Sequence, residues 1–331
     1  MRWFLILFCA VQLFSCSSEY EFRPQLQIHI NKLRSETALG NNDSASLAFL
    51  KDSCSRDELV RLINHKAPII RVLSYRTLVN KKDEDFFEIL KNHLSDTSKL
   101  SWWYFDDAVG DFTVSDLMIR KAERWLTNEQ KDSLVNLVLL KHPYLETADW
   151  MIQDIEPNRA YYSIIKSKAL SKVSRCGVHM GASYALAGFK KQEDVQILKE
   201  NFCSAEDVCT EWAFRAIETF PDTAFYPVLI SYFENVVTKK KQSYSDDLRY
   251  FCQALAQYKT ATSLSILTAL TKKETYPDSW YLPQNREYVF RAIHKYYSPP
   301  YKKIYQELKP TMSANVMEYL DKPAYDEYRT W

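Results

Sequence analysis

The tetrapeptide Phe-Arg-Ala-Ile occurs twice in this chain, at residues 214–217 and again at 290–293. The second copy begins 76 residues after the first, which is two steps of about 38 residues, a length typical of repeats that contain two helices. Residues that share a helical phase with these copies are mostly apolar or small, and this pattern occurs four times in the chain. They are Val178, Ala182, Ala185, Leu186 and Phe189; Cys209, Ala213, Ala216, Ile217 and Phe220; Phe251, Ala254, Leu255 and Tyr258; and Val289, Ala292, Ile293 and Tyr296.

This recurrence predicts the fold class. Small residues at one phase allow neighbouring helices to approach closely, and a unit of two helices can bury its apolar face only against another unit. Gly occurs five times, which disfavours a β-sandwich or barrel with many tight turns. We therefore expect an all-α protein, an α-solenoid of stacked antiparallel helix pairs that form an α/α superhelix.

The N-terminal half carries a similar unit. A mostly apolar segment at 59–63 is followed by a break with Pro68, a second apolar segment that contains Arg71, and a third mostly apolar segment at 86–90. This arrangement resembles a HEAT repeat, and the resemblance implies HEAT-like helical repeats over residues 23–331. The pattern is less regular in residues 100–165, where helices are expected over 114–125 and 128–140, the second capped by Thr127.

The first sixteen residues predict export and a covalent anchor. One arginine, an apolar run and a small residue before a cysteine are typical of a secretory signal. Leu13-Phe14-Ser15-Cys16 resembles the lipobox of bacterial lipoproteins, although Phe14 is bulkier than the residue usual there. The resemblance implies a signal peptide at residues 1–15, a lipidated Cys16, and a short tether at 16–22.

The same segment predicts a location. Two acyl sites on one cysteine would hold the protein at a membrane, and Ser17 after the cysteine suggests the outer membrane of the bacterial cell envelope, facing the periplasm or the cell surface. The rival interpretation is an ordinary secreted protein in which Cys16 is a spare thiol.

Composition and motifs exclude several function classes. With 43 basic and 42 acidic side chains, the chain has no net field that would attract nucleic acid. Gly177 and Gly181 fit close helix packing better than a phosphate site. We find no His-Glu-x-x-His motif and no Cys-x-x-Cys pair for zinc or redox chemistry, so we expect no cofactor, no metal and no catalytic constellation.

The later cysteines leave two alternatives. In an oxidising compartment, Cys203 and Cys209 could form a disulfide across the short turn between two helices. Alternatively, Cys209 and Cys252, which lie at or beside core positions, are buried free thiols that act as small apolar residues.

Two aromatic clusters are candidate contact sites. Trp102 and Trp103 precede Asp106 and Asp107, and aromatic rings beside two carboxylates suit a sugar ligand. The alternative is a connection whose aromatic rings cover the core and whose aspartates cap a helix. Trp280 and Tyr281, in a loop bounded by prolines, suit either a partner interface or packing under the last repeat.

Two functional hypotheses follow. The favoured one is an envelope-anchored helical-repeat lipoprotein that binds another protein as a scaffold or accessory subunit and has no catalytic activity of its own. The alternative is a carbohydrate-binding or carbohydrate-active lipoprotein with an α/α toroid-like fold.

Overall fold

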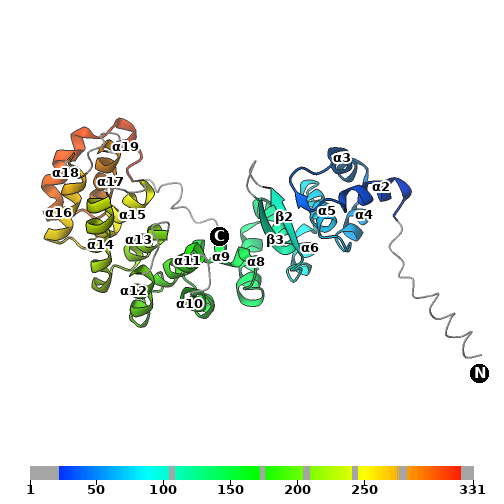
Figure 1. Cartoon of the computed structure of the whole chain (residues 1–331), viewed down its shortest axis with the longest axis horizontal. Coiled ribbons are helices and arrows are strands. Elements are labelled where there is room, and N and C mark those ends of the chain that lie inside the picture. The colour runs from blue at the N-terminus through cyan, green and yellow to red at the C-terminus, as the bar shows by residue number, and fades with distance from the viewer. Residues whose placement is uncertain are drawn as a thin grey trace, which may run out of the picture. The chain divides into compact units, whose positions relative to one another are not determined.

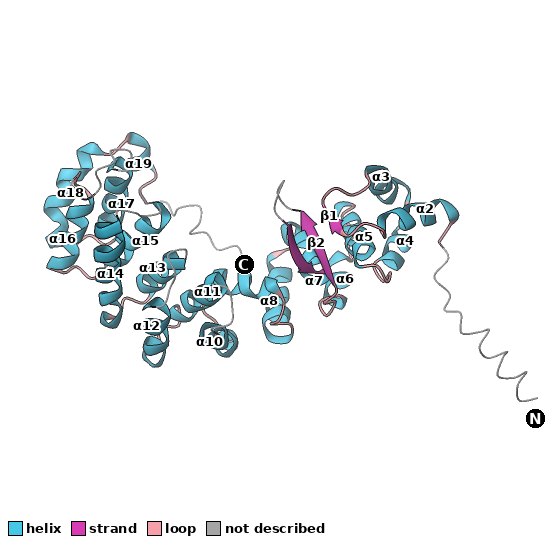
Figure 2. Ribbon diagram, in the orientation of Figure 1, coloured by secondary structure: helices cyan, strands magenta, loops and turns pink. Residues whose placement is uncertain are grey.

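The computed structural model describes residues 22–103, 109–171, 176–203, 209–240, 245–273, 275 and 282–321. Within these residues the chain is mainly helical, with eighteen α-helices and one small sheet (Figures 1 and 2). It divides into two compact units, Met1–Leu134 and Val135–Trp331. Cys16, Asp106, Asp107, Trp280 and Tyr281 lie outside the described residues.

Unit 1 is built around one buried helix. Helix α5 has nine buried residues and packs on α2, α3, α4, α6, α7 and β2. The helices of this unit are α2 (Pro24–Leu33), α3 (Ser44–Ser53), α4 (Arg56–Leu62), α5 (Pro68–Asn80), α6 (Phe86–Asn92) and α7 (Val114–Ala122), the last continued by the 3₁₀ turn η1 (Glu123–Trp125). Helix α8 (Asn128–Lys141) contains the division between the units.

The helix ends of unit 1 follow from local sequence. Ser55 and Glu58 form a reciprocal capping box at the start of α4, which satisfies two otherwise orphaned amides. Pro68 occupies the first turn of α5, where its missing N–H costs nothing. The side chain of Arg71, in α5, donates hydrogen bonds to both carboxylate oxygens of Asp96, with Nε 2.7 Å from Oδ2.

The expected helices in the less regular region are confirmed. Residues 114–125 form α7 and η1, and residues 128–141 form α8. The amide of Gln130 donates to Oγ1 of Thr127 at 3.3 Å, so Thr127 caps α8 as its position predicted.

The all-α prediction is wrong in one place, because unit 1 also contains a three-stranded sheet in the order β1-β2-β3. Strand β1 (Ala38–Leu39) runs parallel to β2 (Lys99–Trp103), and β3 (Val109–Thr113) pairs antiparallel to β2, with Trp102 opposite Gly110. Alternating burial explains the strand: Leu100 and Phe112 lie opposite each other and are both buried. Strands of five residues are too short for their alternation of buried and exposed side chains to be distinguished from chance in the sequence.

Unit 2 contains two interleaved sets of helices (Figure 1). The odd-numbered helices pack in series, α9 on α11, α11 on α13, α13 on α15 and α15 on α17; we call them the inner row. They are α9 (Glu146–Asp154), α11 (Cys176–Ala187), α13 (Thr210–Thr219), α15 (Ser245–Ala256) and α17 (Leu282–Lys295).

The even-numbered helices alternate with the inner row along the chain. They are α10 (Tyr162–Leu170), α12 (Val195–Cys203), α14 (Tyr226–Tyr232), α16 (Ala261–Leu270) and α18 (Lys302–Leu308), and the chain then continues to α19 (Ala314–Glu318). Most begin after a 3₁₀ turn: η2 (Arg159–Tyr161), η3 (Gln192–Asp194), η5 (Thr223–Phe225) and η7 (Pro299–Tyr301); a further turn, η8 (Lys309–Thr311), follows α18. Helix α14 continues as the π-helix η6 (Phe233–Lys240).

The residues predicted to share the inner phase are largely buried. Ala213, Ala216 and Ile217 of α13 are at most 1% exposed, as are their counterparts Ala254 and Leu255 in α15 and Ala292 and Ile293 in α17. Alanines at these positions let the inner helices approach closely. In α11, a Cβ added to Gly181 would lie 2.5 Å from the side chain of Gln153 in α9, so this glycine also serves close packing.

Tyrosine hydroxyls tie neighbouring helix pairs together. Tyr162 at the start of α10 donates to the carboxylate of Asp194, which is fully buried and is also bound by Lys166 at 2.7 Å. Burial and the bond to Glu193 raise the pKa of Tyr162 to about 12. Farther along, Tyr258 donates to the carbonyl of Asp222, and the buried Tyr301 donates to the carbonyl of Ala256.

Three lysines that follow the C-terminal ends of helices have the left-handed backbone conformation that is usually found at glycine. Lys82, Lys190 and Lys259 have φ angles of 57°, 50° and 53°. This conformation costs roughly 1–2 kcal/mol for a residue that has a Cβ.

We expect substitutions of Lys259 to reveal the free-energy cost of its positive φ angle. Lys259→Gly should raise the free energy of unfolding by about 0.5–1 kcal/mol, since relief of strain exceeds the extra entropy that glycine gives the unfolded chain. Lys259→Val removes the same exposed side chain but should lower stability by about 1 kcal/mol, because a β-branched residue tolerates positive φ poorly. Urea denaturation of both variants measures the difference, and equal stabilities would contradict the assignment.

Candidate functional site

Five side chains on three consecutive inner helices form what we call the arginine–aromatic cluster: Tyr184 of α11, Trp212 and Arg215 of α13, and Arg249 and Tyr250 of α15. Tyr250 is 2% exposed, and the other four are half-buried. The helices that hold these residues pack directly on one another, so the cluster spans two helix–helix contacts.

Arg215 is the centre of the cluster. Its guanidinium carbon lies 4.6 Å from the ring centroid of Trp212, 4.7 Å from that of Tyr184 and 5.2 Å from that of Tyr250. Arg249 lies over the ring of Tyr250 at 4.4 Å. Each such cation–π contact contributes roughly 0.5–2 kcal/mol, more when water is excluded, so the guanidinium is held in a defined orientation.

The carboxylate of Glu218, also on the inner row, links α13 to the end of α17. Glu218 near the end of α13 accepts from the hydroxyl of Tyr296 at 2.6 Å and lies 2.9 Å from Nζ of Lys295, both at the end of α17. The side chain of Gln257, just beyond α15, donates to the backbone carbonyl of Glu218. These bonds hold the ends of α13, α15 and α17 together.

The structure describes Trp102 and Trp103 of the candidate aromatic platform, whereas Asp106 and Asp107 lie outside the described residues. The two tryptophans are consecutive in β2, so they point to opposite faces of the sheet. Trp102 contacts Phe112 edge-on and lies under the guanidinium of Arg120, whereas Trp103 is 43% exposed and packs beside Gly40, whose added Cβ would lie 2.8 Å from it.

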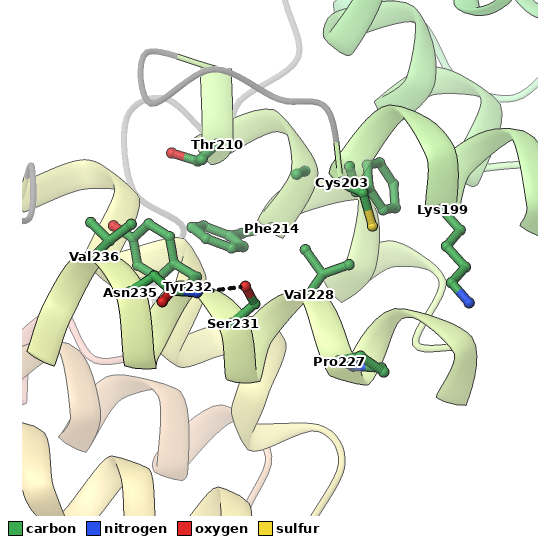
Figure 3. A pocket seen from close by; sticks show the side chains of 12 residues that line it. Lys199, Cys203, Thr210, Phe214, Pro227, Val228, Ser231, Tyr232, Asn235 and Val236 are labelled. Carbon is green, nitrogen blue, oxygen red and sulfur yellow. Dashed lines mark hydrogen bonds between the residues drawn. The ribbon is translucent and has the colours of Figure 1, made fainter. Parts of the chain in front are cut away.

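A cavity of about 390 Å³ lies in unit 2 between α12, α13, α14 and η6. Figure 3 shows Lys199 and Cys203 toward one end and Tyr232 and Val236 toward the other, with a hydrogen bond between Ser231 and Asn235 along one wall. The remaining lining residues are Phe202, Thr210, Ala213, Phe214, Pro227 and Val228. A mostly apolar cavity of this size can accept an apolar group.

The predicted disulfide between Cys203 and Cys209 is wrong. Cys203 is a free and exposed thiol at the end of α12, and its side chain lies at the cavity. Cys209 is disulfide-bonded, although not to Cys203, and is 5% exposed. Short separation in sequence therefore did not identify the partner. The alternative is confirmed for Cys252, which is a buried free thiol, as is Cys54.

The arginine–aromatic cluster was not found from the sequence. The repeated tetrapeptide was interpreted only as a packing motif, yet the similarity extends backward to Glu211 and Trp212 in one copy and Glu287 and Tyr288 in the other. In both copies an aromatic residue stands three positions before the arginine, next to the buried positions of the helix. This spacing is the sequence signal that indicates an aromatic ring beside the arginine.

Comparisons with protein-family models, curated proteins and solved structures found no match for this chain. Function is therefore argued from the geometry and the sequence.

The states of the cysteines lead to a labelling pattern. In the native protein a maleimide should modify Cys203, while Cys54 and Cys252 should react only after unfolding and Cys209 only after reduction. Burial raises the pKa of the Cys54 thiol to about 11 and also raises the pKa of the Cys252 thiol, so neither supplies thiolate at neutral pH. Mass spectrometry of digests identifies the sites; native labelling of Cys209 without reductant would contradict the assignment.

Proposed function

We propose that this protein is an envelope-anchored helical-repeat lipoprotein that binds another protein, as a scaffold or accessory subunit, without catalytic activity of its own. The helices of unit 2 form a HEAT-like α-solenoid in which each inner helix and the following even-numbered helix make one repeat. The bound protein lies along the inner row.

The arginine–aromatic cluster carries this proposal. Trp, Tyr and Arg are the residues most enriched among the hot spots of protein interfaces, and three consecutive inner helices contribute them here. Tyr288 of α17 occupies the same repeat position as Trp212 and Tyr250 and is half-buried. The contacts of Arg215 with three rings and of Tyr184 with Trp212 orient these side chains before binding, which reduces the entropy lost when a partner docks.

One further observation supports an exported protein. Cys209 is disulfide-bonded, and such bonds persist mainly in oxidising compartments such as the bacterial envelope. None of the described helices is both long enough and apolar enough to cross a bilayer. The anchor we propose is lipidated Cys16 after cleavage of residues 1–15, with the protein at the outer membrane.

The alternative function is a carbohydrate-binding or carbohydrate-active lipoprotein. It has less support, because Trp102 and Trp103 are consecutive in β2 and their side chains lie on opposite faces of the sheet.

Photo-crosslinking tests the binding surface. We expect p-benzoylphenylalanine at position 212 or 288 in the full chain, expressed in a bacterium that exports it, to yield a discrete protein adduct. The matched control is position 265, because Ser265 is exposed on the even-numbered helix α16. Adduct yield should be at least fivefold higher at the inner positions. Equal yield at all three positions would contradict the proposed surface.

Metabolic labelling with an alkynyl fatty acid tests the anchor. The full chain should incorporate label and sediment with membranes, whereas Cys16→Ala should lose both properties, because the acyl acceptor is removed. Cys203→Ala is the control for labelling of an exposed thiol and should remain acylated. Label that persists in Cys16→Ala would show that Cys16 is not the acceptor.

A further inference from the structure

We propose that Arg215 binds the side-chain carboxylate of an Asp or Glu in the partner protein, so the segment that docks on the inner row carries an acidic residue at this contact. This inference rests on the function proposed above, and it names the chemistry that the partner must carry.

The ring contacts of Arg215 are cation–π contacts and take up none of its hydrogen-bond donors. A guanidinium carries five N–H donors, all in its plane. Within the described residues no carboxylate lies within 4 Å of this guanidinium, and no hydrogen bond from it is found. The rings therefore orient a half-buried cation whose donors are left for a ligand.

The equivalent arginine of the second copy shows what these donors do when the chain supplies acceptors. Arg291 of α17 donates from Nε to Oε1 of Glu287, four residues earlier, at 2.8 Å, and from a terminal nitrogen to the carbonyl of Tyr319 at 3.3 Å. Glu211 stands four residues before Arg215 in the same way, yet it does not pair with Arg215. A partner carboxylate would take the place that Glu287 takes beside Arg291.

The surrounding charges favour a single carboxylate over a polyanion. Acidic residues flank the cluster: Asp247 of α15 accepts from Thr210 at 2.8 Å, and Glu218 is paired with Lys295. With acidic side chains beside the arginines, the described residues of the cluster form no continuous basic stripe for a nucleic acid or another densely charged chain. A planar carboxylate can instead bind bidentately at the edge of one guanidinium, a geometry that adds both strength and specificity.

Paired peptide libraries test the inference on the full chain. Both libraries hold 15-residue peptides with acetylated and amidated ends and no other acidic residue; the central position is Glu in one and Gln in the other. We expect the tightest Glu peptides to lose at least tenfold in affinity as their Gln forms. They should lose a similar factor against Arg215→Gln, and Arg215→Lys should fall between, because an ammonium lacks the planar fork.

Arg286→Gln is the matched control, since Arg286 also lies on an inner helix but donates to the carbonyl of Thr271; its affinity should equal that of the unaltered chain. Circular dichroism confirms that the variants fold, and Arg215→Lys keeps the test decisive if Arg215→Gln does not. Equal binding of Glu and Gln peptides, unchanged binding by Arg215→Gln, or retention of neither library would overturn the inference. Crosslinking from position 288 that survives Arg215→Gln would show that the proposed function stands while this carboxylate site fails.

Discussion

The structure of unit 2 depends on the burial of each inner helix against the next. The inner helices contact one another in order from α9 to α17, and each contributes buried residues to unit 2. Ala213 and Ala216 of α13, Ala254 of α15 and Ala292 of α17 are at most 1% exposed, because small side chains bring the helix backbones into close contact. The polar ties then fix how successive pairs are placed, as Tyr162 does with Asp194 and Tyr301 with Ala256.

This packing also determines where functional side chains can lie. Positions that face the neighbouring helix are filled by apolar and small residues, so the positions beside them carry the larger groups. The cluster around Arg215 occupies such positions on α11, α13 and α15. Confined to a membrane surface by a lipid at Cys16, a surface of this kind would meet its partner at a raised effective concentration.

Much of the helical framework could be predicted from the sequence, because apolar periodicity reports burial directly. The inner phase of α13, α15 and α17 and the Thr127 cap are confirmed. The sheet was missed since β2 and β3 have five residues each, too few to separate a period of two from chance. The state of Cys203 and the stacking around Arg215 depend on residues brought together by packing. Tyr184 and Tyr250 lie far from Arg215 in sequence, and apolar periodicity alone cannot predict that their rings contact its guanidinium.

Native-state hydrogen exchange of the full chain tests the central claim that the inner row is one packed series. If each inner helix is buried by its neighbours, the amides of α11, α13, α15 and α17 should be the slowest to exchange in unit 2 and should share a similar opening free energy. The even-numbered helices α12, α14 and α16 should exchange faster. Inner helices that open independently at low free energy, or even-numbered helices that are better protected than the inner row, would contradict the account.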